Sequence, residues 1–381
     1  MQAAGVWLEQ PATQELFHAF EGAGHQLFCV GGCVRNALLG APVADIDMST
    51  NAHPDTVLAL ASRLEIRAVP TGIEHGTVTL IVADTPFEVT TFRKDIKTDG
   101  RRAVVAFADT LEEDAQRRDL TINALYCDAS GVITDPVGGV RDIQDKRVRF
   151  IGDAHARLRE DYLRILRFFR FYAWYGAFEG GIDPDGLAAC AALAEGLETL
   201  SGERIGTEMR KLLSAPDPGP AIAAMAHAGV LHRIMPGAEA AGLPVLVHLE
   251  GARALDWSRR AAMLGGEDVT QRWRLSKAEA RELAHLRAAL EADTPLPELA
   301  YRLGAQVAQS VALIRAAGQG QPLEPGLEAQ IAQAENATFP VTATDLMPRL
   351  QGPELGAELT RLEGVWIASG FTLTKADLLA L

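Results

Sequence analysis

Two kinds of hydrophobic pattern follow one another along the chain. In roughly the first 150 residues, short apolar or alternating runs of the kind typical of strands are separated by turn residues. These runs predict strands at 27–30, 77–82, 87–92 and 103–107, with a further strand carrying Asp45 and Asp47. From about Asp153 to the end, apolar residues recur at helical spacing between Pro and Gly, and no run predicts a strand. We therefore expect an α/β region followed by an all-helical region.

The same pattern predicts the helices and one loop. Apolar residues spaced three to four apart predict helices at 11–24, 34–39, from 53 onward, 117–124, 216–229, 253–264, 276–290 and 297–317. A further helical segment with the sequence EDYLRILRFFRF covers 160–171. Residues 93–102 are polar and contain Gly100, so they are expected to form a mobile loop.

Composition excludes several classes of protein. Hydrophobic residues make up 48% of the 381 positions and charged residues 23%, which is typical of a soluble protein of two or more domains. No apolar run reaches membrane-spanning length, and the first residues do not resemble a signal peptide. The four cysteines form no C-x-x-C pair, so zinc is not expected, and buried free thiols in a reducing compartment are.

The charge is unevenly distributed. The net charge of −14 argues against a protein coated in basic charge for nucleic acid. Residues 141–170 nevertheless hold nine Lys or Arg against five Asp or Glu, so a local basic face is expected there.

The segment 28–50 carries the first candidate chemistry. Gly31 and Gly32 turn the chain between a strand and a helix, where backbone N–H groups could hold phosphate. Asp45 and Asp47 are two residues apart on a strand, so their carboxylates face the same way and repel unless a cation lies between them. Magnesium prefers such oxygen ligands. The alternatives are a simple tight turn and a surface D-x-D; Glu88 on a later strand could be a third carboxylate or a solvated residue.

Two further pairs are ambiguous from spacing alone. Asp119 and Asn123 would share a helix face and could grip the hydroxyls of a sugar, but could equally be ordinary surface residues. Asp161 and Arg164 could form a simple i,i+3 salt bridge. Alternatively, Asp161 could accept from the amino group of cytosine or adenine while Arg164 donates to the neighbouring ring nitrogen. Guanine and uracil would present the opposite pattern and be refused, because buried polar groups would stay unpaired.

Taken in order, these motifs resemble a known family. The set comprises Gly31-Gly32-x-x-Arg35, Asp45-x-Asp47, Glu88, Arg117-Arg118-Asp119-x-x-x-Asn123-Ala124, Asp135-Pro136-x-Gly138-Gly139-x-x-Asp142, Glu160-Asp161-x-x-Arg164 and Ser201-x-Glu203-Arg204. Over roughly residues 25–215 it is similar to the class II (bacterial-type) CCA-adding tRNA nucleotidyltransferases and poly(A) polymerases, within the polymerase-β-like nucleotidyltransferases.

The resemblance implies an α+β fold with a seahorse shape. A nucleotidyltransferase head with a mixed sheet and helices would occupy residues 1–150. An all-helical neck carrying the base-recognition helix would occupy 151–215, and a helical body and tail binding tRNA would occupy 216–381. The implied activity is template-independent addition of C, C and A to the 3′ end of tRNA, using CTP and ATP and releasing pyrophosphate. The implied cofactor is Mg²⁺, the implied RNA partner is the tRNA acceptor arm and 3′ end, and the implied compartment is the cytoplasm, with no membrane and no obligate protein partner.

The resemblance also implies a role for each motif residue. Asp45 and Asp47 would be catalytic and hold two magnesium ions, with Glu88 as the third acidic residue. The remaining residues would bind the nucleotide: Gly31, Gly32 and Arg35 at the triphosphate, Arg118, Asp119 and Asn123 at the ribose, and Asp161 and Arg164 at the base. Arg167 would also bind the nucleotide. Residues 135–142 would be a flexible connection and 93–102 a mobile loop that helps the change from C to A.

The chain departs from the family pattern at two positions. Asn36 stands where Asp is usual, which puts a local ion pair with Arg35 in doubt, and Leu120 stands where Phe is usual. Three alternatives stay open at this point: a poly(A) polymerase, an enzyme adding only CC or only A, and a non-catalytic nucleotide- or RNA-binding module.

Overall fold

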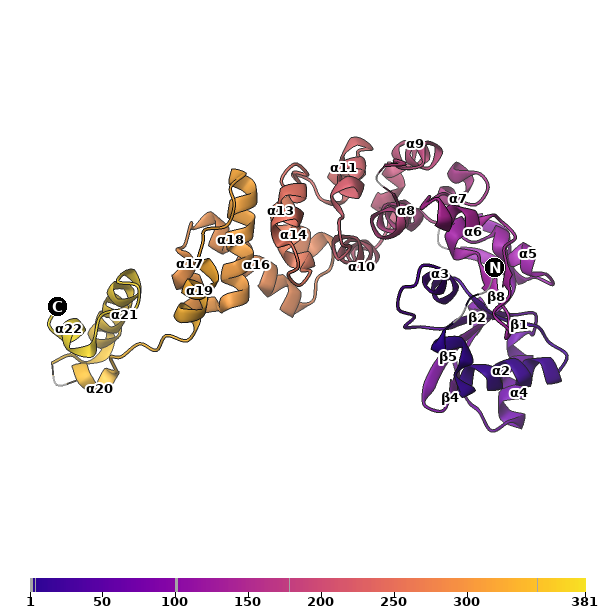
Figure 1. Cartoon of the computed structure of the whole chain (residues 1–381), viewed down its shortest axis with the longest axis horizontal. Coiled ribbons are helices and arrows are strands. Elements are labelled where there is room, and N and C mark those ends of the chain that lie inside the picture. Colours follow the sequence, from indigo (N-terminus) through magenta and orange to yellow (C-terminus); the bar gives the residue numbers. More distant parts are fainter. Residues whose placement is uncertain (1–2, 4, 100–101, 178, 348) are drawn as a thin grey trace. The chain divides into compact units, whose positions relative to one another are not determined.

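The computed structural model describes residues 3, 5–99, 102–177, 179–347 and 349–381. It divides into two compact units, Met1–Ile234 and Met235–Leu381 (Figure 1). The divisions expected at 150 and 215 both fall within the first unit, so they stay predictions. In the described residues, no helix is both long and apolar enough to cross a membrane.

The first unit is built around a seven-stranded mixed sheet with the strand order β3-β4-β5-β2-β1-β8-β9. The strands are β1 (Leu27–Val30), β2 (Asp47–Thr50), β3 (Arg67–Gly72), β4 (Thr77–Val82), β5 (Thr85–Thr91), β8 (Tyr126–Cys127) and β9 (Ile133–Thr134). Only β2 and β5 pair in parallel, and their register sets Asp47 beside Glu88. The other neighbours in the sheet are antiparallel.

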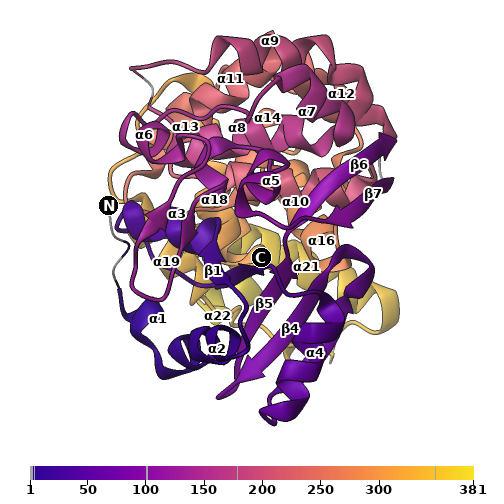
Figure 2. The ribbon, with the colours of Figure 1, turned by 90° about the vertical axis from the view of Figure 1, so that its right-hand side faces the viewer.

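Alternating side chains bury one face of the sheet beneath helices. In β4 and β5, Val78, Leu80, Phe87 and Val89 are almost fully buried, while the residues between them are more accessible. Helix α4 (Pro54–Arg63) packs against β3 and β4, and α2 (Pro11–Gly22) and α3 (Gly32–Leu38) pack against β1 (Figure 2). The strands predicted at 27–30 and 77–82 are confirmed in full. Strand β3 and the short helix α1 (Val6–Glu9) were not predicted.

The loop predicted at 93–102 is wrong for its described residues. Strands β6 (Arg93–Asp99) and β7 (Arg102–Phe107) form a separate two-stranded antiparallel sheet, in which Arg93 is opposite Phe107. Gly100 lies outside the described residues. The polar composition was misleading because the two segments satisfy their backbone N–H and C=O groups on each other, which does not require an alternating apolar face.

The helix predicted at 117–124 is also wrong. Helix α5 (Leu111–Gln116) ends before it, and only a 3₁₀ turn, η2 (Thr121–Asn123), follows. The chain is extended at Leu120, which forms an isolated bridge with Phe150, and the carbonyl of Asp119 accepts from the N–H of Ile151. This pairing with a distant segment takes the backbone groups that a helix would need.

Helices make up the rest of the first unit. They are α6 (Gly139–Gln144), α7 (Ala154–Glu160), α8 (Leu163–Tyr175), α9 (Pro184–Ala192), α10 (Gly202–Leu213), α11 (Gly219–His227) and α12 (Val230–Ile234), with a 3₁₀ segment, η3 (Ala194–Thr199). Helix α8 is central: it packs against α10 and α11, and its buried Phe168 stacks on Phe150 at a centroid distance of 5.1 Å.

In its described residues, the second unit contains helices joined by loops and no strand, apart from an isolated bridge between Ala238 and Gly265. Its helices are α13 (Leu243–Glu250), α14 (Trp257–Leu264), α15 (Val269–Arg272), α16 (Lys277–Glu291), α17 (Leu296–Leu303), α18 (Ala305–Gln319), α19 (Leu327–Glu335), α20 (Ala343–Leu346), α21 (Gly352–Ala368) and α22 (Lys375–Leu379). The helix predicted at 297–317 is two helices, because Gly304 has a φ of 91° and interrupts it. Helix α18 packs against α13, α14, α16, α17 and α19.

Candidate active site

Three carboxylates gather at one end of the sheet. Asp47 opens β2 and is the Cα partner of Glu88 in β5. Asp45 precedes the strand rather than lying on it, which corrects the expectation that one strand carries both aspartates. The alternation still holds, since Asp45 and Asp47 are exposed while Ile46 between them is buried. The expected side-by-side arrangement is therefore present, with the loop before β2 supplying one member.

The electrostatics of Asp47 indicate a place for a cation. Its carboxyl pKa is raised, first because surrounding protein removes part of its water and then because Glu88 and Asp45 repel its charge, while Arg118 acts in the opposite direction. A divalent cation between the carboxylates would relieve that repulsion. No group of three or more His, Cys, Asp or Glu side chains in the described residues is arranged to hold a metal by itself. One or two carboxylates with substrate phosphates completing the shell would suit magnesium, so the residues fit such an ion.

The glycine turn lies beside these carboxylates in sequence and against the 3₁₀ turn in space. Gly31 precedes α3 with a φ of 76°, a conformation that strongly favours glycine, and its N–H donates to the carbonyl of Leu125. A Cβ atom here would lie 3.6 Å from the carbonyl oxygen of Asn123 and 3.7 Å from Nη1 of Arg118. One at Gly32 would lie 3.8 Å from Nη2 of Arg35. The turn is thus surrounded by two arginines expected to bind the nucleotide.

Arg35 is buried between α3 and α8. Its Nη1 donates to Oδ1 of Asn123 (2.5 Å), and its Nη2 donates to Oδ1 of Asn36 (3.0 Å) and to the hydroxyl of Tyr175 (2.9 Å). The guanidinium also lies 4.3 Å from the ring centre of Tyr175, and burial lowers its pKa. Asn36 therefore keeps a local contact with Arg35, in which its neutral amide oxygen accepts a hydrogen bond from the guanidinium in place of an ion pair. The described partners of Arg35 are protein groups that connect it to α8.

Arg118 is held by a buried acid. Its Nε and Nη2 donate to Oδ2 of Asp114 at 3.2 and 3.0 Å, and Nη2 also donates to Oγ of Ser49 at 3.2 Å. Burial alone would lower the pKa of the guanidinium, but Asp114 and Tyr126 raise it, so the group stays charged. The charge of Arg118 acts to lower the pKa of Asp47, and its hydrogen bonds to Ser49 on β2 and to the carbonyl of Asn123 join the sheet to the 3₁₀ turn.

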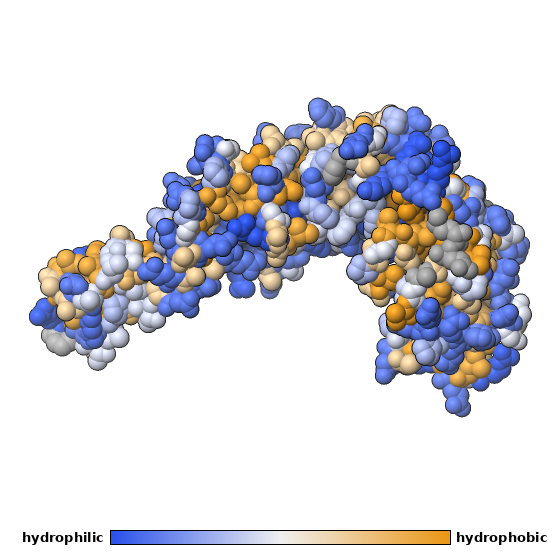
Figure 3. Space-filling view, in the orientation of Figure 1, coloured by the Kyte–Doolittle hydropathy of each residue, from blue (hydrophilic) through white to orange (hydrophobic). Residues whose placement is uncertain are grey.

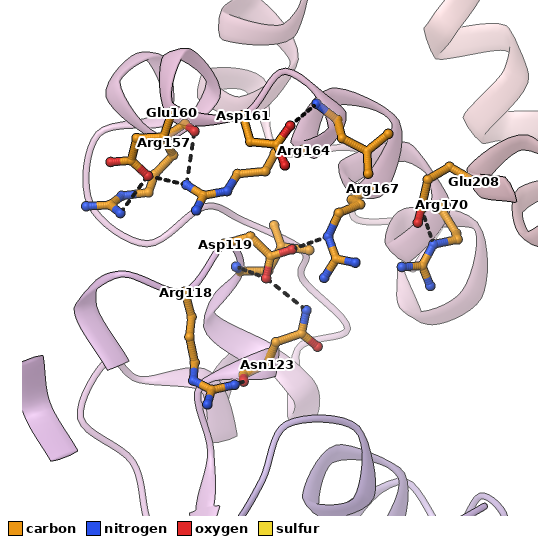
Figure 4. A network of polar contacts seen from close by, with 12 residues as sticks. Arg118, Asp119, Asn123, Arg157, Glu160, Asp161, Arg164, Arg167, Arg170 and Glu208 are labelled. Carbon is orange, nitrogen blue, oxygen red and sulfur yellow. Dashed lines mark hydrogen bonds and ion pairs between the residues drawn. The ribbon is translucent and has the colours of Figure 1, made fainter. Parts of the chain in front are cut away.

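Asp119 and Asn123 do meet, although not on a helix. Nδ2 of Asn123 donates to Oδ1 of Asp119 at 3.2 Å across the 3₁₀ turn, and Nε of Arg167 donates to Oδ2 at 2.6 Å. Burial would raise the pKa of the Asp119 carboxyl, but Arg167 outweighs it and the pKa lies well below the usual range. A hydrogen-bonded path thus runs from Arg35 through Asn123 and Asp119 to Arg167 on α8. Figure 4 shows the part of this path from Asn123 to Arg167.

Asp161 and Arg164 lie at the junction of two helices, not on the face of one. Asp161 ends α7, and Arg164 is in the first turn of α8. Oδ2 of Asp161 accepts from Nη2 of Arg204 at 2.6 Å, and Arg164 forms an ion pair with Glu160. Each residue therefore has its own charged protein partner, which replaces the simple i,i+3 salt bridge. Their side chains lie near Arg167 and Asp119 in the same network (Figure 4).

Sequence reasoning missed several members of this network. Glu160 and Arg164 are four apart and Arg157 and Glu160 three apart, so helical spacing could have indicated those pairs. Arg204 was part of the motif set but was given no role there, yet this residue pairs with Asp161 from 43 positions away. Nothing local in the sequence signals that contact or the one between Tyr175 and Arg35.

Comparisons with known proteins agree with this geometry. Residues 27–149 match the model of the poly A polymerase head domain, and residues 181–241 match that of the probable RNA and SrmB-binding site of polymerase A. The chain is 32% identical to CCA tRNA nucleotidyltransferase 1, mitochondrial, of Mus musculus, over 98% of this chain and 92% of that protein. It is 36% identical to the CCA-adding enzyme of Geobacillus thermodenitrificans, over 79% of this chain and 76% of that protein.

Comparison of the fold with solved structures leads to the same family. The structure is similar to the crystal structure of the Bacillus stearothermophilus CCA-adding enzyme in complex with CTP, with a TM-score of 0.72, 29% identity and coverage of 94% of this chain and 93% of that one. The match to the head-domain model, the 32% identity over nearly the whole chain and the similar fold all agree with the motifs that lie around Asp47 and α8. The chain is a member of the CCA tRNA nucleotidyltransferase family.

Proposed function

We propose that this protein adds C, C and A to the 3′ end of tRNA from CTP and ATP, releasing pyrophosphate, without a nucleic-acid template. The observation that carries the proposal is the pairing of Asp47 with Glu88 on adjacent parallel strands, with Asp45 beside them, in the same compact unit as Asp161 and Arg164. The first set suits phosphoryl chemistry and the second suits recognition of a base edge.

Asp45 and Asp47 are the proposed ligands of Mg²⁺, with Glu88 as the third acid of the site. Of two such ions, one would lower the pKa of the attacking RNA 3′-hydroxyl and the other would neutralise charge at the leaving pyrophosphate. Around them, the chain contributes placement and charge more than covalent chemistry. Arg118, which the resemblance assigns to the ribose, also acts on the charge of Asp47, so that its guanidinium, fixed by Asp114, would add positive charge on the side of the phosphates. Gly31 and Gly32 would let the backbone approach the phosphates.

The sugar and base would be held by the network on η2 and α8. Asp119 and Asn123 present an acceptor and an amide near one another for the ribose hydroxyls, and Arg35 and Arg167 fix both of them. Asp161 and Arg164 would read the Watson–Crick edge by accepting from the amino group and donating to the ring nitrogen. That pattern matches C and A and leaves unpaired groups against G and U.

The helical residues 216–381 are proposed to form the body and tail that hold the acceptor arm through its phosphates. Such binding should weaken as salt rises, because counterions are released when phosphates are neutralised. A plot of log affinity against log salt with no slope would contradict phosphate binding.

The experiment supplies tRNA ending before CCA, tRNA ending in C and tRNA ending in CC, with magnesium and each nucleotide separately, and the products are sequenced. The proposal expects C on the first two substrates, a single A on the third and no G or U on any. Because the head matches the poly A polymerase model, a long A tail is the specific competing outcome. A long A tail, addition of C or A alone, or no product would overturn the proposed function.

A further inference from the structure

Arg157 on α7 contacts Glu160, the same acid that pairs with Arg164, the arginine proposed to read the base. Its Nη1 donates to Oε2 of Glu160 at 2.9 Å, and the same oxygen accepts from Nη1 of Arg164 (Figure 4). The three side chains are mostly buried, with exposed fractions of 20% for Arg157 and 14% for each of the others. One carboxylate oxygen is therefore shared by two guanidinium groups in a place where water screens them only partly.

Some of the N–H donors of the Arg164 guanidinium bind protein acceptors, and others have no described acceptor in the protein. An arginine carries five N–H donors in a rigid plane. Nη1 of Arg164 donates to Glu160 and to the carbonyl of Arg157 (3.0 Å), and Nη2 donates to the carbonyl of Arg117 (3.3 Å). Among the contacts of the described residues, this leaves Nε–H and one Nη2–H for a base. The carbonyl of Arg157 is a backbone group and would stay in place whatever side chain stands at 157, so the Arg157 side chain acts on Arg164 only through the shared oxygen of Glu160.

The net charge of the cluster formed by Arg157, Glu160 and Arg164 also supports a role of Arg157 in keeping Arg164 available to a base. Glu160 and Arg164 alone would form a neutral pair, and the carboxylate would compete with a base for the positive charge of Arg164. Arg157 adds a second positive charge to the same oxygen, so the three groups carry a net charge of +1. The surface over α7 is strongly hydrophilic (Figure 3). On this helix Arg159 is exposed, whereas Arg157 is partly buried and contacts Glu160.

We propose that Arg157 is a positioning residue for base choice: by sharing Glu160 with Arg164, it fixes the plane of the Arg164 guanidinium and keeps its charge available to the base. This rests on the proposed function, because it assumes that Arg164 reads cytosine and adenine. Arg157 touches neither base nor metal in this role. Its substitution should therefore alter selection and nucleotide KM more than the chemical step.

An alternative role for Arg157, direct contact with RNA, has to be distinguished by experiment. Arg157 also lines a cavity of about 380 Å³ together with Lys94, Glu112, Glu113, Gln116 and Arg117, where it could contact RNA directly. A direct RNA contact would not depend on Glu160. The coupling between Arg157 and Glu160 therefore distinguishes the two roles.

The experiment measures kcat and KM for CTP, ATP, UTP and GTP on tRNA lacking CCA, for the full chain and five variants. These are Arg157→Ala, Arg157→Lys, Glu160→Gln, the double variant Arg157→Ala/Glu160→Gln, and Arg159→Ala as the control of equal charge. Loss of one charged hydrogen bond predicts about a tenfold drop in discrimination between CTP and UTP for Arg157→Ala, mainly through KM. Arg157→Lys should recover part of it, and Arg159→Ala should leave selection unchanged.

Within the double-mutant cycle, Arg157→Ala should have little further effect once Glu160 is replaced. Additive losses, unchanged selection in Arg157→Ala, or an equal loss in Arg159→Ala would each overturn the proposal.

The variant Arg164→Ala distinguishes a failure of this proposal from a failure of the proposed function. If Arg164→Ala leaves selection intact, base reading itself is wrong and Arg157 has no such role. If Arg164→Ala relaxes selection and Arg157→Ala does not, only the role of Arg157 is wrong. Thermal melting of each variant checks that the fold is kept.

Discussion

Two groups of carboxylates in the first unit are built in opposite ways. At the end of the sheet, Asp45, Asp47 and Glu88 lie together, and the pKa of Asp47 is raised. In the network around α8, Asp119 pairs with Arg167 and Glu208 pairs with Arg170, both at 2.6 Å, and the pKa of Asp119 is lowered. The second group has its cations built into the protein, whereas the first needs one from outside. We infer that the first serves chemistry and the second serves selection and rigidity.

The largest effect is expected from Asp47→Asn. Removing one charge from the proposed metal site should lower nucleotide addition by at least about a thousandfold, because the metal supplies several kcal/mol of charge stabilisation. Steady-state incorporation of CTP into tRNA measures it. Asp84→Asn, an exposed acid in the turn between β4 and β5, should behave as wild type. Substantial turnover in both Asp47→Asn and Asp45→Asn would show that these residues do not hold the metal.

Asp119→Asn should give the largest loss of stability. Breaking the ion pair with Arg167 leaves a mostly buried guanidinium without its carboxylate, at a cost of about 3 kcal/mol. Urea denaturation at neutral pH measures this, with the exposed Asp185→Asn as control. Because the folded pKa of Asp119 is lowered, its contribution is present above the unfolded pKa and is lost as the pH falls through the folded one. The two curves should converge in acid, and a gap that stays constant would contradict the pairing.

Tyr175→Phe tests the connection between α3 and α8. It removes the hydroxyl that accepts from Nη2 of Arg35 but keeps the ring beneath the guanidinium, so stability should fall by about 1 kcal/mol. Tyr162→Phe at the start of α8 is the matched control, since no described hydrogen bond involves its hydroxyl. Equal effects of the two substitutions would mean that the Arg35 contact contributes nothing specific.

The smallest effect has the opposite sign. Without metal, Asp47→Asn should be slightly more stable than wild type at neutral pH, by less than about 1 kcal/mol because the exposed residue is screened by water. The raised folded pKa means that wild-type stability is fully present below the unfolded pKa and falls as the pH rises through the folded one. Melting curves in chelator should therefore separate with rising pH and coincide in acid. Destabilisation by Asp47→Asn would contradict carboxylate repulsion.

The sheet end could be predicted from sequence because its signals are local. Alternation placed Asp45 and Asp47 on one side and identified the strand carrying Glu88, even though Asp45 lies just outside β2. The strand expected at 103–107 is β7, but its partner β6 was missed because pairing through the backbone leaves no apolar pattern in that segment. Asp119 and Asn123 were correctly associated for the wrong reason, since a 3₁₀ turn rather than a helix brings them together.

The arginine network was the harder part to predict. Its ion pairs join residues far apart in sequence, such as Asp161 with Arg204 and Asp119 with Arg167. Charge alone does not indicate which arginine meets which acid, because that depends on how α7, α8 and α10 pack. Helical spacing could have found only the short-range pairs of Glu160.

One measurement tests the division between chemistry and selection directly. Wild type, Asp47→Ala and Asp161→Ala are given tRNA lacking CCA with magnesium and all four nucleotides, and the 3′ ends are sequenced. The account predicts CCA ends for wild type, unextended ends for Asp47→Ala, and ends of mixed sequence for Asp161→Ala. Extension by Asp47→Ala, or ends of CCA alone from Asp161→Ala, would contradict it.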